Sequence, residues 1–140
     1  MITVLLVRHA DIDLPPGSSN PPLNAKGRAR ADTVAHIAGD AGVTAVFTSS
    51  FTRTKQTAEP LAARLGLQPQ VAPPPLTFAQ QVVSGTLGDV IVVAGHSDTV
   101  PQMIAALGAA PPTIGEREFD NLFVVAVAQS AEAGVVRLKY

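Results

Sequence analysis

The sequence predicts an α/β fold, a three-layer α/β/α sandwich whose sheet is mostly parallel with an antiparallel strand near the C-terminus. Two observations lead to this fold. Short apolar runs rich in valine alternate with segments in which apolar residues recur at helical spacing. The last two apolar runs, 122–127 and 134–138, are joined by a short connection around Ser130 to Ala133. Such a connection favours an antiparallel pair, and therefore a mixed sheet.

Strands are predicted where an apolar run is short and ends in polar or turn-forming residues. The first lies at about residues 2–8, and the prolines and serines of 11–20 then predict a loop. The later strands are 43–47, a short edge strand at 68–71, a run that begins at residue 89 and ends at His96, 122–127 and 134–138.

Helices are predicted at roughly 25–41, 51–65 and 76–87, and after Ser97 or Asp98. Asn24 is the expected N-cap of the first helix, Gly42 its end, and Gly66 the end of the second. Pro60 should kink the second helix or delay its regular start. The first helix has an expected apolar face of Val34, Ile37, Ala38 and Ala41, with His36 on the opposite, solvated side.

Length and composition limit the classes of protein that fit. A chain of 140 residues, 46% apolar with formal net charge −1, predicts one globular domain without electrostatic bias toward nucleic acid or membranes. Cysteine is absent, which excludes a disulfide framework and thiolate chemistry. Residues 2–7 are too short for a signal-peptide core, so a cytoplasmic location is expected.

Basic residues and histidines stand where three predicted strands end. Arg8 and His9 follow the first strand. Arg53 lies near the start of the helix after the second, and His96 ends the run that begins at residue 89. In open α/β sheets ligands bind outside the carboxyl ends of the strands. One such strand end would be explained by solvated polar residues, but three that converge indicate an anion site.

Four blocks of sequence resemble, in the same order, the signatures of the histidine phosphatase superfamily, also called phosphoglycerate-mutase-like. The blocks are Arg8-His9-Ala10, Pro22-Leu23-Asn24-Ala25-Lys26-Gly27, Ser49-Ser50 through Arg53 to Gln56-Thr57-Ala58, and Gly95-His96-Ser97. The resemblance covers nearly the whole chain. It implies a single histidine-phosphatase-like domain over residues 1–140, similar to the short phosphatases of the family.

The residue types fit a metal-independent phosphatase. A neutral imidazole, here His9, can attack phosphorus and form a phosphohistidine that water hydrolyses. Arg8 and Arg53 suit the stabilisation of phosphoryl oxygens, and their charge should help to keep His9 neutral. The resemblance implies that His96 donates to the same oxygens, and Ser49 is a candidate for an additional donor. No metal or other cofactor is required.

The leaving group of a phosphate ester also needs a proton. Many members of the family carry a glutamate after the third strand, yet residues 66–88 here contain no Asp or Glu. Asp11 and Asp98 are the candidate replacements. Asp11 is preferred because its loop should pass over the pocket mouth, whereas Asp98 is expected to cap a helix.

Other functions stay open. Gly95-His96-Ser97-Asp98-Thr99 faintly resembles the nucleophile elbow of α/β-hydrolases, but its fifth residue is not glycine and no histidine follows it. A non-catalytic phosphate-binding module of the same fold would fit the missing glutamate. A phosphomutase is disfavoured because it must shelter its intermediate from water. The substrate is a phosphorylated small molecule or a phosphoprotein, and the sequence does not determine the oligomeric state.

Overall fold

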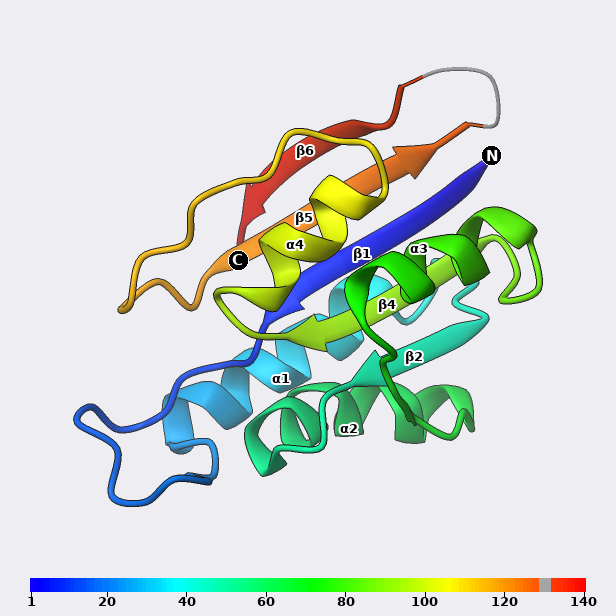
Figure 1. Cartoon of the computed structure of the whole chain (residues 1–140). Coiled ribbons are helices and arrows are strands. Elements are labelled where there is room, and N and C mark those ends of the chain that lie inside the picture. Colours follow the sequence, from blue (N-terminus) through cyan, green and yellow to red (C-terminus); the bar gives the residue numbers. More distant parts are fainter. Residues whose placement is uncertain (129–131) are drawn as a thin grey trace.

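The computed structural model describes residues 1–128 and 132–140, and in them a six-stranded sheet lies between two layers of helices (Figure 1). In chain order the elements are β1 (Ile2–Arg8), α1 (Ala25–Ala38), β2 (Ala45–Thr48), α2 (Thr52–Leu65), β3 (Gln70–Val71), α3 (Pro75–Ser84), β4 (Val90–Gly95), α4 (Thr99–Ala106), β5 (Asn121–Val127) and β6 (Gly134–Lys139).

The sheet has the strand order β3-β2-β4-β1-β5-β6. β5 runs antiparallel to β1 and β6, and the other neighbouring pairs are parallel. This confirms the predicted mixed sheet. Part of the connection predicted around Ser130 to Ala133 lies outside the described residues.

Side-chain alternation along β1 divides the core into two apolar layers. Val4 and Leu6 pack with α3 and α4, while Leu5 and Val7 pack with α1 and α2 on the opposite face. The two pairs of helices accordingly cover opposite faces of the sheet (Figure 1). Burial on both faces explains why β1 is a continuous apolar run in the sequence.

Helix α1 ends at Ala38, earlier than the predicted end at residue 41. At this end the Arg64 guanidinium of α2 lies against Gly39, and its Nη1 donates to the Ala35 carbonyl oxygen at 3.2 Å, so a group from another helix satisfies a carbonyl of the last turn. The predicted apolar face is wrong at Ile37, which is 41% exposed, and at Ala41. The buried positions of α1 are Gly27, Ala31, Val34, Ala35 and Ala38, and His36 is exposed as predicted.

Helix α2 runs from Thr52 to Leu65 with Pro60 inside it, so the predicted late start is wrong. Its buried stripe of Ala58, Leu61 and Ala62 holds it in place, and this packing outweighs the one backbone hydrogen bond that proline cannot make. Gly66 ends the helix in the left-handed conformation, with φ of 66°. Helix α3 likewise ends earlier than predicted, at Ser84, where Gly85 has φ of 80°.

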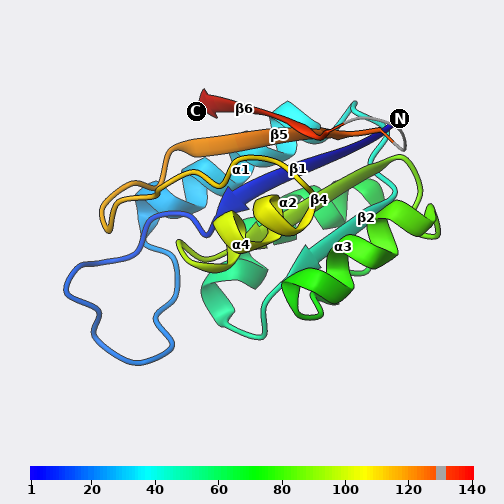
Figure 2. The ribbon, with the colours of Figure 1, turned by 45° about the horizontal axis from the view of Figure 1, so that its top comes forward.

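The fold brings three strand ends to one place. β1, β4 and β2 run in the same direction, and their carboxyl ends meet at one edge of the sheet (Figure 1). The loop after β1 extends beyond this edge (Figure 2). None of the helices in the described ranges has the length and apolar character needed to cross a membrane.

Candidate active site

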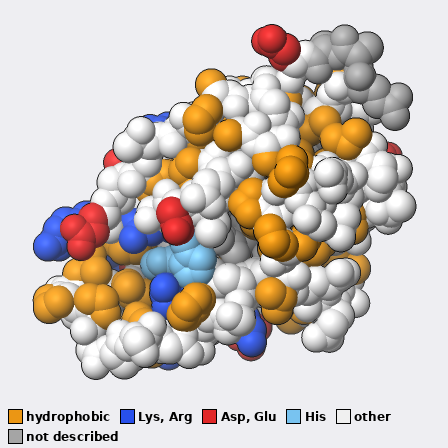
Figure 3. Space-filling view, viewed as in Figure 1, with side chains coloured by type: hydrophobic (Ala, Val, Ile, Leu, Met, Phe, Trp, Pro, Cys, Tyr) orange, Lys and Arg blue, Asp and Glu red, His pale blue; other side chains and the backbone are white. Residues whose placement is uncertain are grey.

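A cavity of about 770 Å³ opens at the carboxyl ends of β1 and β4. Its charged and imidazole-bearing lining residues are Arg8, His9, Arg53, His96, Asp98 and Glu116. Its apolar lining residues are Ile12, Leu14, Pro16, Pro21 and Phe51, and Ser18, Ser19, Ser97 and Thr99 complete it. On the molecular surface the histidine side chains lie in a hollow with basic, acidic and apolar groups around them (Figure 3). The structure therefore brings all four predicted anion-site residues into one cavity.

The register of β1 and β4 places the two histidines side by side. Arg8 is paired with Gly95, and the His9 amide donates to the Gly95 carbonyl oxygen at 2.7 Å. His9 and His96 are thus the first residues beyond two adjacent strand ends. Their ring centroids are 5.5 Å apart, and the rings meet edge to face.

His9 is held as a neutral imidazole. Its side chain is buried, and Nδ1 lies 2.9 Å from the Ala10 carbonyl oxygen. Because a carbonyl oxygen only accepts, Nδ1 carries the ring hydrogen and Nε2 keeps its lone pair. Burial is the main reason that the pKa of His9 falls to about 4, and the charges of Arg8 and Arg53 lower it further. Nε2 is therefore available as a nucleophile at neutral pH.

This assignment predicts the titration of His9. In ¹⁵N NMR we expect the His9 ring to titrate with a midpoint of about 4 and to carry its hydrogen on Nδ1 at neutral pH. A His9→Asn variant identifies the signal. A midpoint near the ordinary histidine value of about 6.5, or a hydrogen on Nε2, would contradict the assignment.

Arg8 connects the cavity to the loop that precedes β5. Its Nη1 lies 2.8 to 3.1 Å from the carbonyl oxygens of Gly115, Glu116 and Glu118, and its Cζ lies 4.2 Å from the ring centroid of Phe119. Its Nε is buried without a hydrogen-bond partner among the described residues. A buried, charged N–H group without a partner is unfavourable, so this atom is suited to bind an anion.

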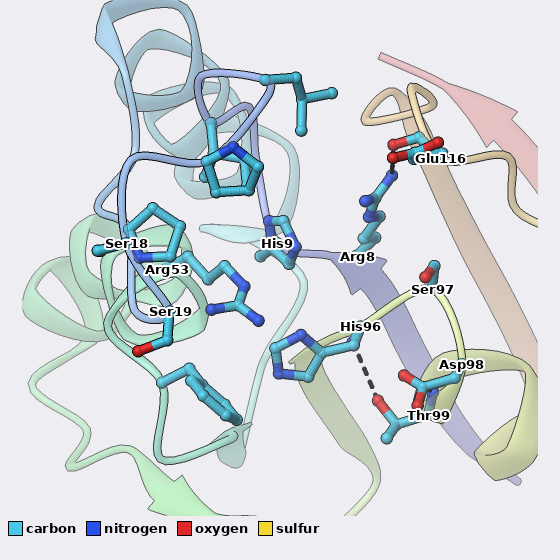
Figure 4. A pocket seen from close by; sticks show the side chains of 15 residues that line it. Arg8, His9, Ser18, Ser19, Arg53, His96, Ser97, Asp98, Thr99 and Glu116 are labelled. Carbon is cyan, nitrogen blue, oxygen red and sulfur yellow. Dashed lines mark hydrogen bonds between the residues drawn. The ribbon is translucent and has the colours of Figure 1, made fainter.

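Arg53 supplies a second such group from the first turn of α2. Its Cζ lies 4.5 Å from the ring centroid of Phe51, which orients the guanidinium. Its Nη1 is buried, and in the described part of the chain it too has no hydrogen-bond partner. The Arg53 side chain points between the two histidines, whereas Arg8 runs toward Glu116 (Figure 4).

His96 is fixed by contacts on both its backbone and its ring. Its amide donates to Thr99 Oγ1 at 3.0 Å, and its Nε2 lies 2.8 Å from Ser49 Oγ. Ser49 was expected to be an additional phosphate donor, but it is not among the residues that line the cavity. Its hydroxyl contacts Thr54 Oγ1 and His96 instead, so Ser49 positions the His96 ring.

Asp11 is the residue that the sequence favours as proton donor to the leaving group, but it does not line the cavity. Its carboxylate faces α1, where Oδ1 accepts from Arg30 Nε at 2.6 Å. Its backbone is enclosed by the Pro22–Gly27 block: Asn24 N donates to Asp11 O at 3.0 Å, and a Cβ on Gly27 would collide with that oxygen. Asp11 is thus a structural residue that ties the chain after His9 to α1.

Two other carboxylates line the cavity. Asp98 caps α4, as predicted, since Oδ1 accepts from Thr99 N at 2.9 Å. Glu116 belongs to the loop held by Arg8 and was not singled out in the sequence. One signal in the sequence could have pointed to Glu116. If β5 runs antiparallel to β1, the start of β5 lies beside the carboxyl end of β1, and the loop just before β5 lies near the site.

Comparison with protein-family models gives one match. The model of the histidine phosphatase superfamily, branch 1, matches residues 4–74, which are 71 of the 140 residues. The chain belongs to the histidine phosphatase superfamily. No curated protein sequence matches it.

Several solved structures are similar in fold over almost the full chain. The protein histidine phosphatase SixA, complexed with tungstate, has a TM-score of 0.77 and 20% identity, with 99% of this chain and 97% of that one covered. A mycobacterial glucosyl-3-phosphoglycerate phosphatase with inorganic phosphate has a TM-score of 0.74 and 14% identity, with coverage of 100% and 97%. A structure named mycobacterial hydrolase 1 has a TM-score of 0.72 and 16% identity, with coverage of 100% and 98%. At these identities the similarity shows the fold.

Proposed function

We propose that residues 1–140 act as one histidine phosphatase domain, a phosphatase that hydrolyses a phosphomonoester or a phosphohistidine through a covalent phosphohistidine on His9. One observation carries the proposal. Arg8 Nε and Arg53 Nη1, two buried N–H donors without partners among the described residues, belong to side chains that line one cavity with the neutral His9. This combination offers positive charge for a phosphoryl group and a lone pair to attack it.

In the first step His9 Nε2 forms a bond to phosphorus, and the bond from phosphorus to the leaving group breaks. The leaving group takes a proton, for which Asp98 and Glu116 are the carboxyl groups at the cavity. In the second step water attacks phosphorus and gives a proton to the carboxylate that acted as the acid, the bond to Nε2 breaks, and inorganic phosphate leaves. Nδ1 remains hydrogen-bonded to Ala10 throughout, which holds the ring in the attacking tautomer.

The two arginines and His96 stabilise the charge that spreads over the phosphoryl oxygens. Burial and the charge of Arg53 lower the pKa of His96, while the Asp98 carboxylate acts in the opposite direction. A bound phosphate dianion favours the protonated ring, and a protonated His96 would then donate to a phosphoryl oxygen. Because these groups belong to the chain itself, the reaction as proposed needs no metal ion.

The experiment mixes the protein rapidly with an aryl phosphate and quenches in alkali. We expect turnover and a phosphoenzyme that is stable in alkali and labile in acid, both unchanged by a chelator. Phosphate binding without turnover would identify the chain as a binding module. Loss of activity with chelator and its recovery with a divalent ion would contradict the proposed mechanism.

The similar structures include a protein histidine phosphatase and a glucosyl-3-phosphoglycerate phosphatase. A hydrolysis screen should therefore contain phosphohistidine protein as well as small phosphate esters.

A further inference from the structure

The cavity carries acidic charge on one side only. Asp98 and Glu116 lie on the side of α4 and the loop before β5, and Ser18, Ser19 and Arg53 lie across from them (Figure 4). Neither carboxylate has an ion-pair partner in the described part of the chain. Acidic residues in the same region that face away from the cavity do have one: Glu118 and Asp120 both pair with Lys139.

The same cavity is lined by a buried cationic side chain. Arg8 is only 8% exposed, and its Nε has no partner among the described residues. The charged lining residues are two arginines and two carboxylates, and His9 is neutral. A phosphate dianion bound by the arginines would cancel their charge, so the two carboxylates of Asp98 and Glu116 would be opposed only by the single charge of a protonated His96.

The fields of both carboxylates reach the anion site. The pKa of His96 is lowered chiefly by burial and by Arg53, and Asp98 opposes that shift. Burial and Arg53 also lower the pKa of Arg8, and Glu116 opposes this. The wall across the cavity, from Ile12 to Pro21, contributes apolar and hydroxyl groups but no carboxylate.

We propose that Asp98 and Glu116 make the site selective for substrates that carry a positive charge close to the phosphate, and that they reject substrates with a second anionic group. A protonated amine or imidazole next to the phosphate would compensate the two carboxylates. A carboxylate at the same place would add a third negative charge beside them. The inference rests on the proposed function, because it assigns the group that accompanies the phosphate in the same cavity.

Non-hydrolysable phosphonates separate this selectivity from catalysis. Ethylphosphonate, 2-aminoethylphosphonate and phosphonoacetate are close in size and differ in the charge next to the phosphonate. We measure the Kd of each by chemical-shift titration of the full chain at one pH and ionic strength. The cationic ligand should bind about tenfold or more tighter than the anionic one, and added salt should reduce the ratio.

Variants that each remove one negative charge test whether Asp98 and Glu116 produce the selectivity. Asp98→Asn keeps a good N-cap for α4, and Glu116→Gln removes a carboxylate that has no ion-pair partner in the described residues. Each should reduce the ratio, and the double variant should remove most of it. The matched controls are Asp32→Asn and Glu59→Gln, which remove exposed carboxylates that do not line the cavity. Thermal unfolding verifies that each variant is folded.

Equal affinity of the wild-type protein for the three phosphonates would overturn the proposal. So would a ratio that survives in the double variant or falls equally in the controls. Turnover of an aryl phosphate is measured separately. If turnover is absent while the charge preference persists, the proposed catalytic function fails and the selectivity stands.

Discussion

Replacing His9 with alanine should lower kcat for an aryl phosphate by about a thousandfold or more and abolish phosphoenzyme formation. The effect is large because the Nε2 lone pair is the proposed nucleophile, and positioning of phosphate by the arginines does not replace a bond-forming group. Binding should suffer less than catalysis. The variant keeps Arg8, Arg53 and His96, so inorganic phosphate should still bind.

The measurement compares single-turnover rates and trapped phosphoenzyme in the two proteins. His36→Ala is the matched control, because it removes an exposed histidine on α1 that does not line the cavity. It should leave both quantities near the wild-type values. Phosphoenzyme that persists in the His9→Ala protein would assign the nucleophile to another residue.

Replacing Arg53 with alanine should lower kcat/KM by about a hundredfold or more, because a charge-assisted donor to the phosphoryl oxygens is lost. Arg53 is a cleaner test than Arg8. Arg8 Nη1 also holds three carbonyl groups of the loop before β5, so its removal would disturb structure and catalysis together. Arg53→Lys keeps the charge but loses the planar fork, and it should recover only part of the activity.

The rate and the Kd of inorganic phosphate are measured for both Arg53 variants. Arg28→Ala, an exposed arginine of α1 outside the cavity lining, is the control for a general change in charge. Unchanged phosphate affinity in Arg53→Ala would show that Arg53 does not contact the phosphoryl group and would remove it from the proposed mechanism.

The convergence of Arg8, His9, Arg53 and His96 could be predicted because it depends on chain order and strand direction alone. Arg8 ends a strand of the parallel part of the sheet and the other three residues follow such strands, and parallel strands end at the same edge. The pairing of Arg8 with Gly95 then sets the distance between the histidines. The roles assigned to these residues stay predictions.

The predictions that the structure does not support concern features that depend on contacts between segments distant in sequence. Asp11 pairs with Arg30 outside the cavity lining, and Arg64 of α2 contacts the end of α1. Ser49 contacts a histidine that lies 47 residues later. No local pattern contains these partners, since hydrophobic spacing and capping signals report only the neighbourhood of each residue.

The contacts between Arg8 and the loop before β5 also affect when the cavity can form as the protein folds. Arg8 and its three carbonyl partners are 107, 108 and 110 residues apart, among the most distant pairs along the chain. Contacts of such high sequence separation close the largest loops and are slow to form. During synthesis the first strand and its histidine leave the ribosome long before residues 115–118 exist. Catalytic competence should therefore appear only with the last steps of folding, which would make activity a stricter reporter of complete folding than secondary structure.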